Sequence, residues 1–147
     1  MTEEKERTNL EKLDSFYDLE KDWNLYNADP VPKEVIDYSK DILQKLVKQP
    51  DEVFPTAANS IQFEYDDDPL CNHLEFDIRA YYDKDGFYVE WLASMKNPES
   101  ANGAFTYIDG TIHENIEDTM NELISKYISW IYYGYGKNDF LPYLFII

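Results

Sequence analysis

The spacing of hydrophobic residues changes twice along the chain, and each change marks a different kind of element. In the first fifty residues, hydrophobic positions recur every three or four residues, which is the period of an amphipathic helix. Residues 8–11, Thr-Asn-Leu-Glu, form a capping-box pattern, so we expect a first helix that begins there and ends near Ala28. Residues 29–32, Asp-Pro-Val-Pro, interrupt the pattern, and Pro32 suits the first position of a second helix that ends before Pro50.

In the middle of the chain the period falls to two, which is the period of a strand with one buried face. Hydrophobic and polar residues alternate over 61–65, 74–80 and 87–91, and residues 104–108 give a shorter fourth strand before an Asp-Gly pair. Residues 85–86, also Asp-Gly, join the second and third strands in a turn that requires a positive φ. We therefore expect an antiparallel meander of three to four strands.

The helical period returns in the last third of the chain. Residues 111–114, Thr-Ile-His-Glu, form a second capping-box pattern, and a hydrophobic stripe from Ile116 to Ile131 predicts a C-terminal helix that ends before Gly134. Residues 140–147 are almost wholly apolar, and two alternatives are open for this tail: it completes the core of the monomer, or it packs against a second copy in a homodimer. The whole pattern predicts a single α+β domain over residues 1–147, with two N-terminal helices, the meander, a C-terminal helix and the apolar tail.

The charge of the chain then limits the classes of partner that it could bind. Thirty acidic residues against thirteen basic ones give a formal net charge of -17, and fifteen acidic against three basic residues lie within 62–125. Like charge at this density is self-repulsive, so it indicates either a solubility device or a surface for a positively charged partner. The same sign argues against nucleic acid as a direct ligand, because affinity for phosphates comes mainly from Lys and Arg.

Cysteine usage and the N-terminal residues bear on the compartment. The one cysteine, Cys71, cannot form a disulfide within the chain, and the first residues lack the apolar stretch of a secretory signal. No apolar run approaches the roughly 18 residues that cross a bilayer. We therefore expect a cytoplasmic protein without a membrane partner.

The candidate site is a set of carboxylates on the outward face of the predicted strands. Side chains at alternate positions share a face, so acidic residues of three neighbouring strands would meet across the sheet, and the acidic loop that follows the first strand extends the set. This pattern is open to three interpretations: an acidic docking face, an ordinary solvated face, or a catalytic carboxylate pair. The predicted partner-binding residues are Glu64, Asp66, Asp67, Asp68, Glu75, Asp77 and Glu90.

Motifs for catalysis or metal binding are weak. A sheet nuclease would have a lysine two residues after Glu90, where this chain has Leu92, and the acids at 66–68 lack the spacing of an EF-hand. Neither His73 nor His113 has a cysteine or a second histidine at metal-site spacing, so we expect ordinary surface roles for both. We expect no enzyme, no cofactor and no metal, and the alternative is a divalent-metal-dependent enzyme or nucleotide-binding protein that uses acids on the sheet face.

One stretch of sequence resembles a known family. Asp22-Trp23-Asn24 with Tyr26, Ala28 and Pro30, followed by Val-Phe-Pro-Thr at 53–56, Ile-Gln-Phe-Glu at 61–64 and Leu-Glu-Phe-Asp-Ile at 74–78, resembles a family of small uncharacterised bacterial and phage-associated proteins. The resemblance covers residues 10–92 and implies an α+β fold in a mobile-element setting. It implies no activity and carries no functional residue over to this chain.

Together, these features favour a non-enzymatic inhibitor that docks on a basic protein partner. A nuclease or another nucleic-acid-binding effector offers such a surface in its nucleic-acid groove, where carboxylates would take the places of phosphates. Anti-CRISPR and anti-restriction inhibitors, antitoxins and immunity proteins are small, acidic and cytosolic in the same way.

Overall fold

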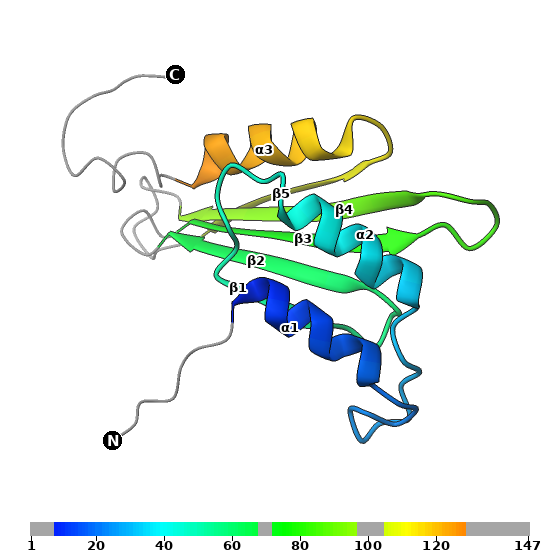
Figure 1. Cartoon of the computed structure of the whole chain (residues 1–147). Coiled ribbons are helices and arrows are strands. Elements are labelled where there is room, and N and C mark those ends of the chain that lie inside the picture. Colours follow the sequence, from blue (N-terminus) through cyan, green and yellow to red (C-terminus); the bar gives the residue numbers. More distant parts are fainter. Residues whose placement is uncertain (1–7, 68–71, 97–104, 129–147) are drawn as a thin grey trace, which may run out of the picture.

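A five-stranded antiparallel sheet with helices on one side forms the described part of the molecule (Figure 1). The computed structural model describes residues 8–67, 72–96 and 105–128. The strands follow one another in sequence order and are β1 Glu52–Pro55, β2 Ile61–Asp67, β3 Asn72–Ala80, β4 Phe87–Lys96 and β5 Phe105–Ile112. The helices are α1 Asn9–Ser15, the 3-10 turn η1 Phe16–Asp18, α2 Lys33–Leu43 and α3 Ile116–Tyr127. The predicted α+β meander is confirmed, with five strands where three to four were expected.

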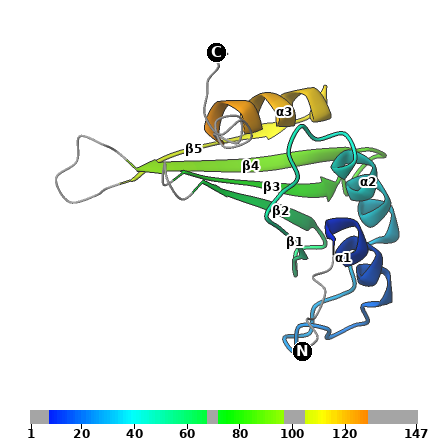
Figure 2. The same ribbon diagram turned by 60° about the vertical axis from the view of Figure 1, so that its left-hand side comes forward.

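The core lies between the helices and one face of the sheet, as the alternating pattern requires. Phe63 on β2, Phe76 on β3 and Val89 on β4 are fully buried, and each is flanked by polar residues that point to the other face. Leu13 of α1, Ile36 of α2 and Ile124 of α3 complete the same core cluster. In Figure 2 the three helices lie along one side of the sheet, and no described helix covers the other side.

The first helix begins as predicted but is much shorter. The capping box is present, because the Thr8 hydroxyl accepts a hydrogen bond from the Glu11 amide and the Glu11 carboxylate accepts one from the Thr8 amide. The expected end near Ala28 is wrong, because α1 stops at Ser15 and continues only as η1. Hydrophobic residues at helical spacing beyond residue 18 therefore belong to a loop.

Polar side chains explain that loop. The Asn24 side-chain oxygen accepts hydrogen bonds from the amides of Tyr26 and Ala28, and the backbone is left-handed at Asp22, Leu25 and Asn27. Asn and Asp compete with helical hydrogen bonding by bonding to nearby backbone amides. The hydrophobic spacing of this segment was therefore a misleading signal.

The second helix and the first strand also differ from the prediction. Pro32 is the N-cap of α2 rather than its first residue, and the helix ends at Leu43, well before Pro50. Strand β1 was not predicted, because four residues are too few for an alternating pattern and the last of them is Pro55. Its pairing with β2 supplies the regularity that its own sequence lacks.

The boundary between the last strand and the last helix lies further along the chain than predicted. Strand β5 continues through Gly110 to Ile112, so the second capping box is wrong: Thr111 lies within the strand, opposite Glu90. Helix α3 begins at Ile116 after Asn115, whose backbone is left-handed. The turn at Gly86 has the positive φ that the sequence predicted.

Part of the predicted C-terminal helix and the apolar tail lie outside the residues that the structure describes. Helix α3 ends at Tyr127, whereas the predicted stripe runs to Ile131, and that residue, Gly134 and the tail at 140–147 lie outside the described residues. Among the helices described, none is long and apolar enough to cross a membrane.

Candidate acidic sheet face

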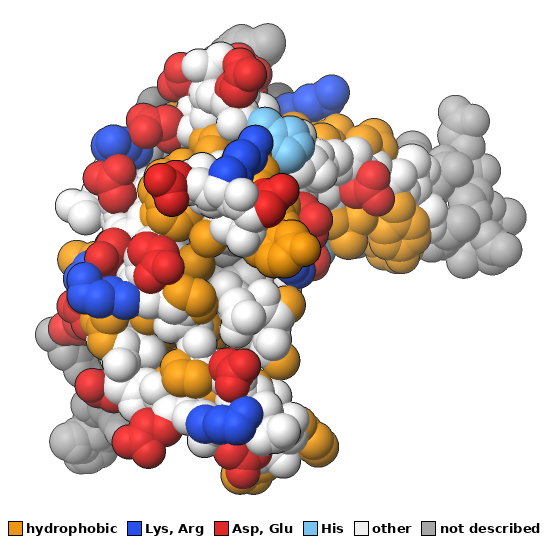
Figure 3. All heavy atoms as spheres, turned by 90° about the vertical axis from the view of Figure 1, so that its right-hand side faces the viewer, with side chains coloured by type: hydrophobic (Ala, Val, Ile, Leu, Met, Phe, Trp, Pro, Cys, Tyr) orange, Lys and Arg blue, Asp and Glu red, His pale blue; other side chains and the backbone are white. Residues whose placement is uncertain are grey.

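The side of the sheet that no described helix covers carries most of the candidate residues. We call it the open face. The space-filling view in Figure 3 shows a molecule hollowed on one side, so the open face is concave rather than flat. The charged residues of this face whose side chains the structure describes come from strands β1 to β5 and are Glu52, Glu64, Asp66, His73, Glu75, Asp77, Arg79, Glu90 and Asp109.

Strand register places several carboxylates directly opposite one another. Glu64 is opposite Glu52 on one side and opposite Glu75 on the other, while Asp77 is opposite Glu90. Neighbouring strands are about 4.8 Å apart, so these charges are close, and like charges directly opposite destabilise a sheet. These like-charge pairs are therefore unfavourable for the sheet except where a cation lies between them.

The structure gathers five of the seven predicted partner-binding residues on this face: Glu64, Asp66, Glu75, Asp77 and Glu90. Asp67 does not join them, because it lies on the helix side of β2 and is only 5% exposed. Asp68 lies outside the described residues. Asp109 was missed, because the Asp-Gly pair was interpreted as the end of a strand that in fact continues to Ile112.

Arg79 neutralises one end of the open face. Its guanidinium bonds to Asp77 Oδ2, with Nε at 2.9 Å and Nη2 at 2.8 Å, and its Nε lies 3.5 Å from Glu90 Oε1. The Asp77 side chain is only 18% exposed, and its other carboxylate oxygen, Oδ1, is buried without a hydrogen-bond partner among the described residues. Asp77 is therefore engaged within the protein, whereas Glu90 remains about half exposed.

His73 lies between two carboxylates at the other end of β3. Its Nδ1 is 2.7 Å from Asp66 Oδ1, and its Nε2 is 2.9 Å from Glu75 Oε1. Burial lowers the pKa of His73, but the hydrogen-bonded carboxylates of Asp66 and Glu75 outweigh it, so the pKa lies above its ordinary value. His73 is thus held by two carboxylates of the same face, and the expectation of an ordinary surface role stays a prediction. The signal in the sequence was the position of His73, two residues before Glu75 and so on the same face.

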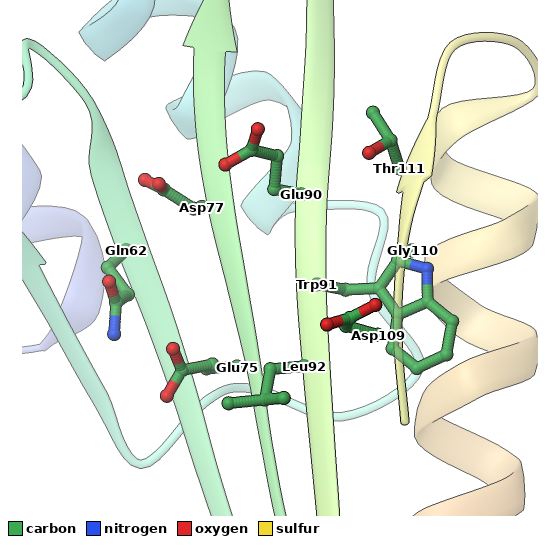
Figure 4. A pocket seen from close by; sticks show the side chains of 9 residues that line it. All are labelled: Gln62, Glu75, Asp77, Glu90, Trp91, Leu92, Asp109, Gly110 and Thr111. Atoms are coloured by element: carbon green, nitrogen blue, oxygen red, sulfur yellow. The ribbon is translucent and has the colours of Figure 1, made fainter. Parts of the chain in front are cut away.

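A shallow pocket of about 420 Å³ lies in the middle of the open face. Figure 4 shows Asp77 and Glu90 side by side in its upper part and Glu75, Leu92 and Asp109 in its lower part. Leu92 occupies the position where a sheet nuclease would have a lysine, so an apolar side chain separates two acidic ones.

Aromatic residues bound the open face beyond Arg79. The rings of Tyr81, Tyr88 and His113 stack on one another with centroids 4.8–5.9 Å apart, and the Lys84 ammonium lies 4.4 Å from the centre of the Tyr81 ring. His113 thus belongs to an aromatic cluster at the end of β5 rather than to a helix cap. This contact could not be expected from the residue pattern, because the three rings come from separate segments.

Comparison of the chain with models of protein families, with curated proteins and with solved structures finds no match. The resemblance to the small bacterial and phage-associated family therefore stays a prediction.

Proposed function

We propose that the protein is a non-enzymatic cytoplasmic binding protein whose open face docks on a basic surface of a protein partner. One observation carries the proposal: among the residues of this face whose side chains the structure describes, seven carboxylates accompany one guanidinium and one imidazole. Both of these groups are already in contact with carboxylates of the same face. Glu52 also lies 3.8 Å from the Lys12 ammonium of α1, and the negative charge that remains is available to a partner.

The accessibility of the carboxylates supports docking. Glu52, Asp66 and Glu90 have side chains that are 60%, 52% and 49% exposed. A regular sheet spaces them along and across its strands, which suits the several Lys and Arg side chains of a basic groove. Charge-assisted hydrogen bonds would form on contact, and attraction at longer range would raise the rate of encounter.

The concave shape and the charge together favour one kind of partner. A protein that binds nucleic acid presents clustered Lys and Arg, and an inhibitor that places carboxylates against them competes with phosphates. We therefore propose that the partner is a nuclease or another nucleic-acid-binding effector, as for inhibitors of the anti-CRISPR, anti-restriction, antitoxin or immunity type.

The test uses a variant that removes charge from the open face and keeps the residues that hydrogen-bond to His73 and to Asp77. The chosen substitutions are Glu52→Gln, Glu90→Gln and Asp109→Asn. Binding to a panel of purified nucleic-acid-binding effectors is followed by stopped-flow fluorescence at several salt concentrations, and by competition with each effector's own nucleic acid. Because steering by charge is screened by salt, we expect the association rate to fall steeply with ionic strength, and the triple variant to associate about tenfold more slowly.

A matched control removes the same amount of charge from the helix side. Its substitutions are at exposed positions of α2 and α3: Glu34→Gln, Asp118→Asn and Glu122→Gln. This variant should associate within about twofold of the parent protein, because these positions lie away from the proposed interface. Equal slowing by both variants would show that net charge alone matters, and binding that is insensitive to salt would contradict the proposal.

A further inference from the structure

A second feature of the open face is a cluster of three donor groups around His73. Glu64 on β2, His73 on β3 and Glu75 on β3 each offer one ligand atom, and these atoms all lie within 4.8 Å of one another. Glu64 and Glu75 are directly opposite across the two strands, and His73 is two residues before Glu75, so pairing of β2 with β3 forms the cluster. All three residues are partly buried.

Neighbouring side chains hold two of these donors in place. Asp66 Oδ1 lies 2.7 Å from His73 Nδ1, which turns the other ring nitrogen, Nε2, toward Glu75. The Gln62 amide donates a hydrogen bond of 2.8 Å to Glu64 Oε2, which leaves Glu64 Oε1 for another partner. Histidines that bind metals commonly donate their second ring N–H to a carboxylate in this way, which fixes the orientation of the ring. The arrangement around His73 therefore has an outer layer of support as well as the donors themselves.

Either a proton on His73 Nε2 or a metal cation in its place fits between the donors. If His73 donates its Nδ1 proton to Asp66 in a hydrogen bond and carries no proton on Nε2, then Nε2 and Glu75 Oε1 are two acceptors only 2.9 Å apart, with the carboxylate of Glu64 close by. Two acceptors at this separation repel unless a proton or a metal cation lies between them. The guanidinium of Arg79 does not serve, because it is bonded to Asp77.

We propose that Glu64, His73 and Glu75 bind a divalent transition-metal cation, Zn²⁺ in the first instance, through His73 Nε2 and one carboxylate oxygen of each glutamate. One imidazole and two carboxylates are a donor set for Zn²⁺, Co²⁺ or Ni²⁺ rather than for Mg²⁺ or Ca²⁺, which prefer oxygen ligands alone. Ligand distances of about 2.0–2.2 Å require the side chains to adjust slightly, because His73 Nε2 and Glu75 Oε1 are nearer to each other than two ligands of one tetrahedral ion, and water would complete the coordination. This inference does not depend on the docking function, because it concerns the free protein.

The test is a metal titration of the full chain after treatment with a chelator. Isothermal titration with Zn²⁺ should show one site per chain, and Co²⁺ should give the visible absorption of a low-symmetry site with nitrogen and oxygen ligands. His73→Gln and Glu75→Gln should each weaken Zn²⁺ binding by more than about tenfold, and Asp66→Asn should weaken it by about tenfold through loss of the ring's orientation. Mg²⁺ in excess should not displace Co²⁺.

Two control variants separate a site from diffuse attraction. Glu90→Gln removes one charge from the same face, and His113→Gln removes the other histidine; both should bind Zn²⁺ within about threefold of the parent protein. Far-UV circular dichroism checks that every variant is folded. Absence of Zn²⁺ binding in the parent protein, unchanged binding in His73→Gln, or an equal loss in Glu90→Gln would each overturn the proposal. None of these outcomes depends on a protein partner, so they leave the docking proposal to its own test.

Discussion

The substitution Gly110→Ala tests the packing at the edge of the sheet, because that packing decides whether the free energy of unfolding rises or falls. Gly110 on β5 is directly opposite Trp91 on β4, and Figure 4 shows the indole beside the glycine backbone. A Cβ at this position would lie 2.8 Å from Trp91 Nε1, 3.1 Å from Cε2 and 3.2 Å from Cζ2. The indole has little freedom to retreat, because it also packs near the Tyr127 ring of α3, with 6.4 Å between centroids.

Two opposed effects determine how much Gly110→Ala changes the free energy of unfolding. In an ordinary strand position, alanine stabilises relative to glycine by about 0.5–1 kcal/mol, because the unfolded chain loses less entropy. Forcing an extra carbon against a packed ring costs about 1–3 kcal/mol. We therefore expect a net loss of about 1–2 kcal/mol in the free energy of unfolding. For a chain of this size, each kcal/mol lowers the melting temperature by about 2–4 °C.

The assay is a double-mutant cycle by urea denaturation. Gly110→Ala is measured in the parent protein and in a Trp91→Leu background, where the ring that causes the clash is gone. Alanine should destabilise the parent protein and stabilise the Trp91→Leu variant. Thr111→Ala, one residue further along β5 on the opposite face, serves as a control and should change stability by no more than about 0.5 kcal/mol. An equal effect of alanine in both backgrounds would refute the reasoning.

Two further predictions concern the core and the first helix. Tyr65 is buried and donates a hydrogen bond to the Lys48 carbonyl, and burial raises its pKa well above the ordinary value. Its stabilising contribution is therefore complete below about pH 10 and is lost as the pH rises from there toward the native pKa, by about 1.4 kcal/mol per pH unit. In Tyr65→Phe this alkaline loss should be absent, so the two curves of unfolding free energy against pH should converge above pH about 10, and parallel curves would contradict the assignment. Thr8→Ala removes the cap of α1 and should lower the free energy of unfolding by about 1 kcal/mol in urea denaturation, whereas an unchanged value would mean that α1 contributes little.

Local chemistry explains where the sequence misled. Trp23 and Tyr26 continue the helical spacing of Leu13, but the side chain of Asn24 satisfies backbone amides that a helix would have used. Hydrophobic spacing indicates which side chains could share a face, but it does not indicate which backbone hydrogen bonds form. The same reason applies to Thr111, which has the spacing of a cap but belongs to β5 and pairs with Glu90 of β4.

At the candidate site, too, the sequence pattern predicted some features correctly and others wrongly. Alternation within each strand predicted that Glu64, Glu75 and Glu90 face away from the core, and all three lie on the open face. The stretch from Asp66 to Asp68 was treated as one acidic loop, but β2 extends to Asp67, so Asp66 and Asp67 point to opposite faces.

The sequence by itself determined which side chains share a face, because side chains alternate along any strand and burial follows hydrophobicity. It could not determine which residues meet across strands, because register depends on hydrogen bonds between segments far apart in the chain. Only the pairing of β2 with β3 sets Glu64 opposite Glu75 and brings His73 between Asp66 and Glu75. Only the continuation of β5 along β4 adds Asp109 to the open face and lays Gly110 under the ring of Trp91. The composition of the face was thus local information, whereas its sites arise from contacts that form only in the folded chain.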